Sequence, residues 1–126
     1  MKIILVIEDN EQNMYLTTYL LENRGYEVMQ AWNGHEGLAM AEQEKPALIL
    51  LDIQLPEMDG YTVARKIRAN DTLQDVPIVA VTSYAMVGDR ERIMEAGCTG
   101  YIEKPINPEA FVAEIEKYLP DGSAGN

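Results

Sequence analysis

The stretch "IILVIEDN", residues 3–10, places five consecutive apolar residues directly before two adjacent acids, Glu8 and Asp9. A continuous apolar run of this length is typical of a strand covered on both faces, as in a parallel sheet. Adjacent carboxylates repel each other, and a buried strand gains nothing from carrying them. We therefore expect Glu8 and Asp9 to serve a purpose at the end of the strand.

Two other segments, residues 47–51 and 76–81, share the continuous apolar pattern of the first strand, which we place at residues 2–7. Residues 27–30 and 99–102 are weaker strand candidates. Helices are predicted over residues 10–24, from 33 to just before Pro46, over 59–69, over 87–96, and from Asn107 onward. This alternation predicts an α/β fold, a (βα)₅ doubly wound parallel sheet of five strands with right-handed crossovers.

Helix ends and helix faces can also be read from the residues. Gly25 suits the left-handed position after a helix, Asn33 and Glu36 have the spacing of a capping box, and Asn107 followed by Pro108 is typical of a helix start. The residues expected to face the core are Met14, Thr17, Leu21, Val63, Ile67, Phe111, Ile115 and Tyr118.

The length of 126 residues indicates one domain, which we place at residues 1–119, with a short polar tail at 120–126. The net charge of −11 argues against nucleic acid and anionic membranes as partners. Cys98 is the only cysteine and is expected to pack as a small apolar residue. Neither a signal peptide pattern nor an apolar segment of ~20 residues is present, so we expect a cytoplasmic location.

Polar residues follow the strong strands at the edge where function gathers in doubly wound sheets. Since surface loops are generally polar, spacing alone leaves open whether these residues form a site or a solvated rim. In chain order they are Glu8, Asp9, Asp52, Thr82, Ser83 and Lys104, the last followed by Pro105.

Four motifs lie at these strand ends: "IEDN", "LILLDIQLPEMDG", "VAVTSYA" and "GYIEKPI". Each is weak alone, but together and in this order they resemble the receiver domain of bacterial two-component response regulators, over residues 2 to about 119. The resemblance implies the strand order 2-1-3-4-5. The opening "EDNEQN" is most similar to single-domain cell-division regulators of the DivK type and to receivers of hybrid histidine kinases.

The resemblance also implies a role for each acid. Asp52 would accept a phosphoryl group from a histidine kinase or a histidine phosphotransfer protein. Asp9, Asp52 and the backbone carbonyl of Gln54 would bind Mg²⁺, and Glu8 would act through bound water. Like charges ~4 Å apart cost about 4 kcal/mol at an effective dielectric constant of 20, so clustered carboxylates need a counter-ion. Mg²⁺ suits oxygen ligands and phosphate.

The remaining roles concern the phosphoryl group and its readout. By resemblance, Thr82 would hydrogen-bond the phosphoryl oxygens and Lys104, before a cis proline bond, would pair with them. Small Ser83 leaves Asp52 accessible to the donor. Tyr101 would change rotamer on activation, and the downstream protein would bind the surface of the fourth helix, fifth strand and fifth helix. We also hypothesise that Tyr84 slows dephosphorylation.

Other functions fit these residues less well. A Mg²⁺-dependent small-molecule phosphohydrolase would need an acid where Gln54 stands, and a flavodoxin-like carrier would need a phosphate-binding loop in place of "EDNEQN". A degenerate scaffold would lack key positions, all of which are present. A receiver excised from a hybrid kinase remains open. Asp59 is expected only to cap a helix, and His35 to be exposed or capping.

Overall fold

The computed structural model describes residues 2–83 and 86–119, so the expected tail and Tyr84 lie outside the described residues. Strands and helices alternate along the chain as expected. The strands are β1 (Ile3–Ile7), β2 (Glu27–Ala31), β3 (Leu48–Asp52), β4 (Ile78–Thr82) and β5 (Gly100–Glu103). The helices are α1 (Glu11–Asn23), α2 (Gly34–Glu44), α3 (Gly60–Arg68), α4 (Val87–Glu95) and α5 (Phe111–Glu116), with a 3₁₀ turn at Asp71–Leu73.

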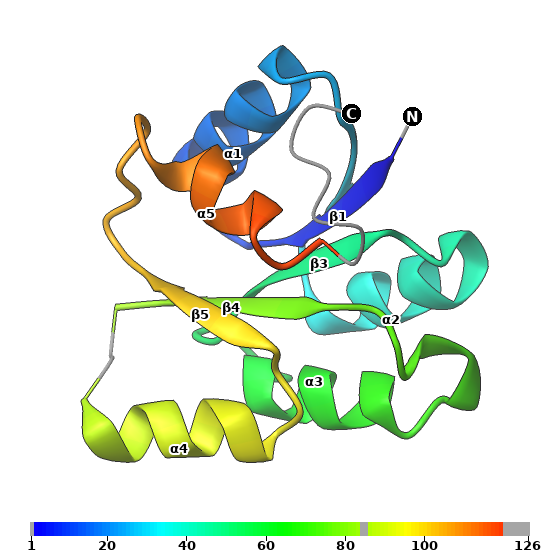
Figure 1. Ribbon diagram of the computed structural model, residues 1–126. Helices are drawn as coiled ribbons and strands as arrows, with labels where there is room; N and C mark the ends of the chain where they lie inside the picture. The colour runs from blue at the N-terminus through cyan, green and yellow to red at the C-terminus, as the bar shows by residue number, and fades with distance from the viewer. Residues whose placement is uncertain (1, 84–85, 120–126) are drawn as a thin grey trace.

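The five strands form one parallel sheet in the order β2-β1-β3-β4-β5, which confirms the predicted fold. Helices α1 and α5 cover one face, and α2, α3 and α4 cover the other (Figure 1). In the register of the sheet, Ile7 lies beside Leu51, and Asp52 lies beside Val81. The carboxyl ends of the three central strands therefore meet at one edge.

The central strands are buried on both faces because successive side chains enter two separate cores. Leu5 and Ile7 pack toward α2, α3 and α4, whereas Ile4 and Val6 pack toward α1 and α5. Full burial of one such aliphatic side chain contributes about 1.5–3 kcal/mol. This two-sided burial explains why the strands read as continuous apolar runs. Within residues 2–83 and 86–119, no helix has both the length and the apolar character needed to cross a bilayer.

Two expectations about helix ends need correction. Asn33 caps α2 by accepting from Glu36 N at 2.9 Å, but the Glu36 carboxylate accepts from Trp32 N at 2.8 Å, one residue earlier than a capping box requires. Helix α5 begins at Phe111 rather than directly after Asn107. Asn107 still caps this segment: its side-chain oxygen accepts from Glu109 N at 3.1 Å, and its carbonyl accepts from Ala110 N at 3.1 Å and from Phe111 N at 2.9 Å. Residues 108–110 therefore form a capped turn that leads into the helix.

The other local expectations are confirmed. Gly25 follows α1 with a φ of 99°, in the left-handed region. Asp59 caps α3 by accepting from Thr62 N at 2.9 Å. The predicted core residues are buried, except that Tyr118 is half-buried; the buried ones are Met14, Thr17, Leu21, Val63, Ile67, Phe111 and Ile115.

A buried carboxylate that the sequence did not reveal joins α5 to the end of α1. Glu116, in α5, accepts from Arg24 Nη2 at 3.0 Å and from the Tyr26 hydroxyl at 2.6 Å. Glu116 is 4% exposed, while the Arg24 side chain is 48% exposed. Solvent therefore screens the arginine's contribution, and the hydrogen bond from Tyr26 is the better shielded of the two.

We expect Glu116→Ala to lower the free energy of unfolding by about 1–3 kcal/mol, because both donors lose a charged acceptor. Urea unfolding followed by circular dichroism measures this change. Lys117→Ala, at the exposed neighbouring position, is the control and should shift stability by less than about 0.5 kcal/mol. Equal effects of the two variants would show that the buried contact contributes nothing.

Candidate functional site

Three carboxylates meet at the edge where β1 and β3 end. Oxygen atoms of Glu8, Asp9 and Asp52 all lie within 4.8 Å of one another. Because Ile7 and Leu51 are neighbours in the sheet, the residues that follow them emerge side by side. Glu8 and Asp52 are buried, with 4% and 3% exposure, and Asp9 is exposed. The cluster therefore has a protein-covered side and a side open to solvent.

Lys104 supplies the positive charge of this cluster. Its Nζ lies 3.3 Å from Asp52 Oδ2 and 3.5 Å from Glu8 Oε1, and its side chain is only 16% exposed. The Lys104 backbone N–H donates to the Thr82 carbonyl at 2.8 Å, which fixes the residue just beyond β5. The Lys104–Pro105 bond is cis, as the family resemblance implied. The Lys104 ammonium group thus pairs with the two buried carboxylates of the cluster, Glu8 and Asp52.

The charge balance of the site is visible in the pKa of Glu8. The pKa of Glu8 is raised from 4.5 to about 7. Burial of the carboxyl group is the largest cause, followed by the charge of Asp52 and a hydrogen bond with Asp52. Lys104 and the backbone N–H of Asn10, 3.2 Å from Glu8 Oε2, act in the opposite direction without cancelling the rise. The site therefore favours either a proton on Glu8 or an added cation.

The backbone around Asp52 is held by contacts from two loops. Gln54 N donates to Asp52 Oδ1 at 2.9 Å, and the Gln54 side-chain oxygen accepts from Ser83 N at 3.2 Å. Gly60 approaches from α3: a Cβ there would lie 2.7 Å from the Asp52 carbonyl oxygen and 2.5 Å from Ile53 Cα. No side chain fits in that space, so position 60 requires glycine.

Sequence reasoning missed both of these supports. The "MDG" segment was interpreted only as a helix cap, although Asp-Gly after a strand also allows close backbone approach. Nothing in the sequence signalled that the Gln54 side chain would bridge to the loop after β4, because its partner is 29 residues away.

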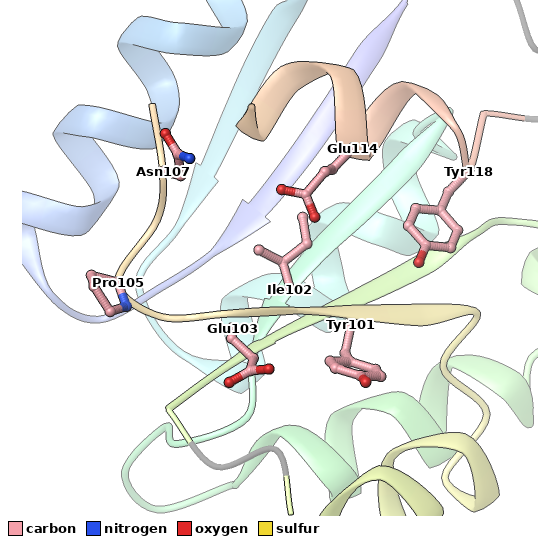
Figure 2. Close-up of a pocket in the computed structure, with 7 residues that line it drawn as sticks. All are labelled: Tyr101, Ile102, Glu103, Pro105, Asn107, Glu114 and Tyr118. Carbon is pink, nitrogen blue, oxygen red and sulfur yellow. The ribbon is translucent and has the colours of Figure 1, made fainter. Parts of the chain in front are cut away.

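Thr82 and Tyr101 lie on the two strands at the far side of the site. Thr82 ends β4, is 1% exposed, and sits beside Glu103 in the register of the sheet. Tyr101 lies half-buried on β5 opposite Ala80, two residues from the level of Thr82. Figure 2 shows its side chain on the opposite side of β5 from Ile102. The structure thus brings Glu8, Asp9, Asp52 and Lys104 together and sets Tyr101 apart from them.

Two residues excluded from the site behave as expected. Cys98 is buried, and burial raises the pKa of its thiol to about 11, so the reactive thiolate is suppressed. His35 is exposed near the start of α2. Neither has the surroundings of a catalytic group.

Comparison with known proteins agrees with this geometry. A model of the response regulator receiver domain matches residues 4–116. The polar-differentiation response regulator DivK of Brucella anthropi is 46% identical over 120 residues, which cover 95% of this chain and 98% of the relative. Its counterpart in Brucella ovis is 44% identical, with the same coverage. This chain belongs to the response regulator receiver domain family.

Solved structures show the same relationship. Chemotaxis protein CheY4 of Vibrio cholerae superimposes with a TM-score of 0.91 at 27% identity, covering 94% of this chain and 99% of that one. The receiver domain of sensor histidine kinase PA1611 from Pseudomonas aeruginosa PAO1 has a TM-score of 0.86 at 34% identity, covering 93% and 96%. That receiver is described with a magnesium ion coordinated in its active-site cleft.

The raised pKa of Glu8 makes the stability of metal-free protein depend on pH. Between pH 4.5 and about 7 the unfolded state ionises Glu8 while the folded state retains its proton, so stability falls as pH rises through this window. Glu8→Gln removes the titration. Relative to wild type, we expect Glu8→Gln to be about 1–2 kcal/mol more stable against unfolding at pH 8 than at pH 5.5.

Denaturant unfolding in the presence of a chelator provides the measurement. Glu11→Gln, at an exposed position on the first turn of α1, is the matched control and should show no such pH-dependent gain. A gain from Glu8→Gln that is the same at both pH values would contradict the expectation.

Proposed function

We propose that this chain is a phosphorylation-controlled switch. Asp52 accepts a phosphoryl group from a phosphohistidine on a kinase or phosphotransfer protein, and the phosphorylated protein signals by binding another protein. One observation carries the proposal: the buried Asp52 carboxylate lies 3.3 Å from Lys104 Nζ and within 4.8 Å of Glu8 and Asp9. This arrangement offers a nucleophile, a counter-charge and metal ligands at one point.

The reaction needs few groups from the protein. A carboxylate oxygen of Asp52 forms a bond to phosphorus as the donor's N–P bond breaks, and that electron pair stays on the imidazole nitrogen. The Gln54 N–H orients Asp52 through Oδ1. The Lys104 ammonium stabilises negative charge on the transferring oxygens, and the Thr82 hydroxyl, at the end of the neighbouring strand, hydrogen-bonds one of them.

The acidic cluster fits Mg²⁺. Carboxylate oxygens are the hard ligands this ion prefers. The pKa of Glu8 is raised first by burial and then by the charge of Asp52, and Lys104 does not cancel this rise, so a further cation would stabilise the ionised carboxylates. Asp9, Asp52 and the backbone carbonyl of Gln54 would be ligands, and Glu8 would act through bound water. The ion, when bound, neutralises charge on the phosphoryl oxygens. The magnesium described in the PA1611 receiver supports this assignment.

The output surface would be formed by α4, β5 and α5. Among the residues that the structure describes, strand β5 pairs with β4 alone, so no further strand lies along its other edge. A pocket of about 430 Å³ runs along this edge, lined by Tyr101, Ile102, Glu103, Pro105, Asn107, Glu114 and Tyr118 (Figure 2). An open strand edge with a pocket beside it suits a protein partner, and Tyr101 would report the state of Asp52 there.

Gln54 argues against a small-molecule phosphohydrolase. Its amide cannot protonate a leaving group, and its side-chain oxygen already accepts from Ser83 N at 3.2 Å. A receiver within a hybrid kinase would use the same chemistry, as the likeness to the PA1611 receiver illustrates.

Incubation with acetyl phosphate and Mg²⁺ tests the phosphoacceptor directly. We expect mass spectrometry to find one phosphoryl group on the wild type and none on Asp52→Asn. Asp59→Asn is the matched control, because asparagine also caps a helix and should leave labelling intact. Labelling of Asp52→Asn would refute Asp52 as the acceptor, and rapid repeated turnover would instead indicate a hydrolase.

Metal binding is tested separately by calorimetric titration with Mg²⁺. We expect Asp9→Asn to raise the dissociation constant for Mg²⁺ by about tenfold or more, because the substitution removes one charged ligand. Asp71→Asn, on the 3₁₀ turn, is the control for a general loss of negative charge. An equal loss in the two variants would mean that Asp9 contributes only to the overall field.

A further inference from the structure

Helix α4 carries two arginines that each lie over a tyrosine ring. The Arg90 guanidinium carbon is 5.5 Å from the centroid of Tyr101 on β5. The Arg92 guanidinium carbon is 4.3 Å from the centroid of Tyr61 on α3. Both are cation–π contacts. They attach the same helix to different neighbours, and only the Arg90 contact involves the residue expected to move on activation.

The position of Arg90 allows its contact with Tyr101 only while the ring stays near the surface. Arg90 is exposed, and Tyr101 is half-buried at the open edge of β5. A guanidinium that followed the ring toward buried Thr82 would lose its hydration, and an unpaired buried charge is strongly unfavourable. The ring therefore leaves the cation behind when it moves inward.

We propose that Arg90 is a positioning residue that holds Tyr101 in its outer position and so sets how readily phosphorylation activates the switch. This inference rests on the proposed function, because it requires Asp52 to take the phosphoryl group and Tyr101 to respond. An exposed cation–π contact is worth about 0.5–1 kcal/mol, which corresponds to about a two- to fivefold bias toward the outer position. The bias opposes any ligand that favours the inner position.

Beryllium fluoride with Mg²⁺, a mimic of the phosphoryl group, is the probe. We expect Arg90→Ala to bind beryllium fluoride about two- to fivefold more tightly than wild type. In this variant the Tyr101 ring can move inward without breaking a cation–π contact. Arg90→Lys retains a cation and should restore the wild-type affinity. Arg92→Ala is the matched control: it removes the closer of the two contacts from the same helix and should leave the affinity unchanged.

Fluorine NMR of 3-fluorotyrosine-labelled protein gives a second readout. The Tyr101 signal, assigned by its loss in Tyr101→Phe, should shift in ligand-free Arg90→Ala part of the way toward its mimic-bound position. In a Tyr101→Leu background, removing Arg90 should no longer change the affinity for the mimic.

The outcomes separate this inference from the proposed function. If wild type binds the mimic and the affinity of Arg90→Ala is equal to or lower than that of wild type, the proposed role of Arg90 is refuted, while the phosphoacceptor site stands. Equal tightening in Arg92→Ala would also overturn it, since that result indicates a general loosening of α4. If wild type fails to bind the mimic, the proposed function falls, and the role of Arg90 falls with it.

Discussion

Two carboxylates buried side by side at the edge of the sheet are the constraint on which the rest of this structure depends. Glu8 and Asp52 are almost fully covered, and Asp9 lies within reach of both. Like charges ~4 Å apart cost about 4 kcal/mol even at an effective dielectric constant of 20. The parallel sheet imposes the arrangement, because β1 and β3 are neighbours and end within one residue of each other. A fold that brings these groups together needs a proton on Glu8 or cations beside the carboxylates, and Lys104 provides one cation.

The repulsion can be sustained because the surrounding framework is rigid. Ile4, Val6, Leu5 and Ile7 alternate between two cores, so β1 cannot shift without disturbing both. Lys104 is fixed by the strands beyond β3. Its backbone N–H donates to the Thr82 carbonyl and so continues the pairing of β4 with β5. The charged groups are therefore held in place by hydrogen bonds and packing that do not depend on their own interactions.

The sequence predicted the parts of this design that repeat or lie close together in the chain. Continuous apolar runs located the buried strands to within one or two residues, because burial on both faces leaves no polar positions. Strand order came only from family resemblance, since pairing is a tertiary property. The predicted start of α5 was too early, because Asn107 caps a turn over residues 108–110 and the regular helix begins only at Phe111. The contacts of Glu116 join residues more than 90 positions apart, with no periodic signal.

On the proposed function, the placement of Tyr101 follows from the same packing. The central strands have a hydrogen-bonded neighbour on each side, whereas β5, among the described residues, pairs with β4 alone. Thr82 and Tyr101 belong to adjacent strands, and Tyr101 pairs with Ala80, two residues before Thr82. A change at the acidic cluster thus has a short route through β4 to Tyr101 on the edge strand β5. The response to phosphorylation then depends on the position of Tyr101. A weak surface contact, such as the cation–π contact of Arg90, has a free energy small enough to adjust that position without locking it.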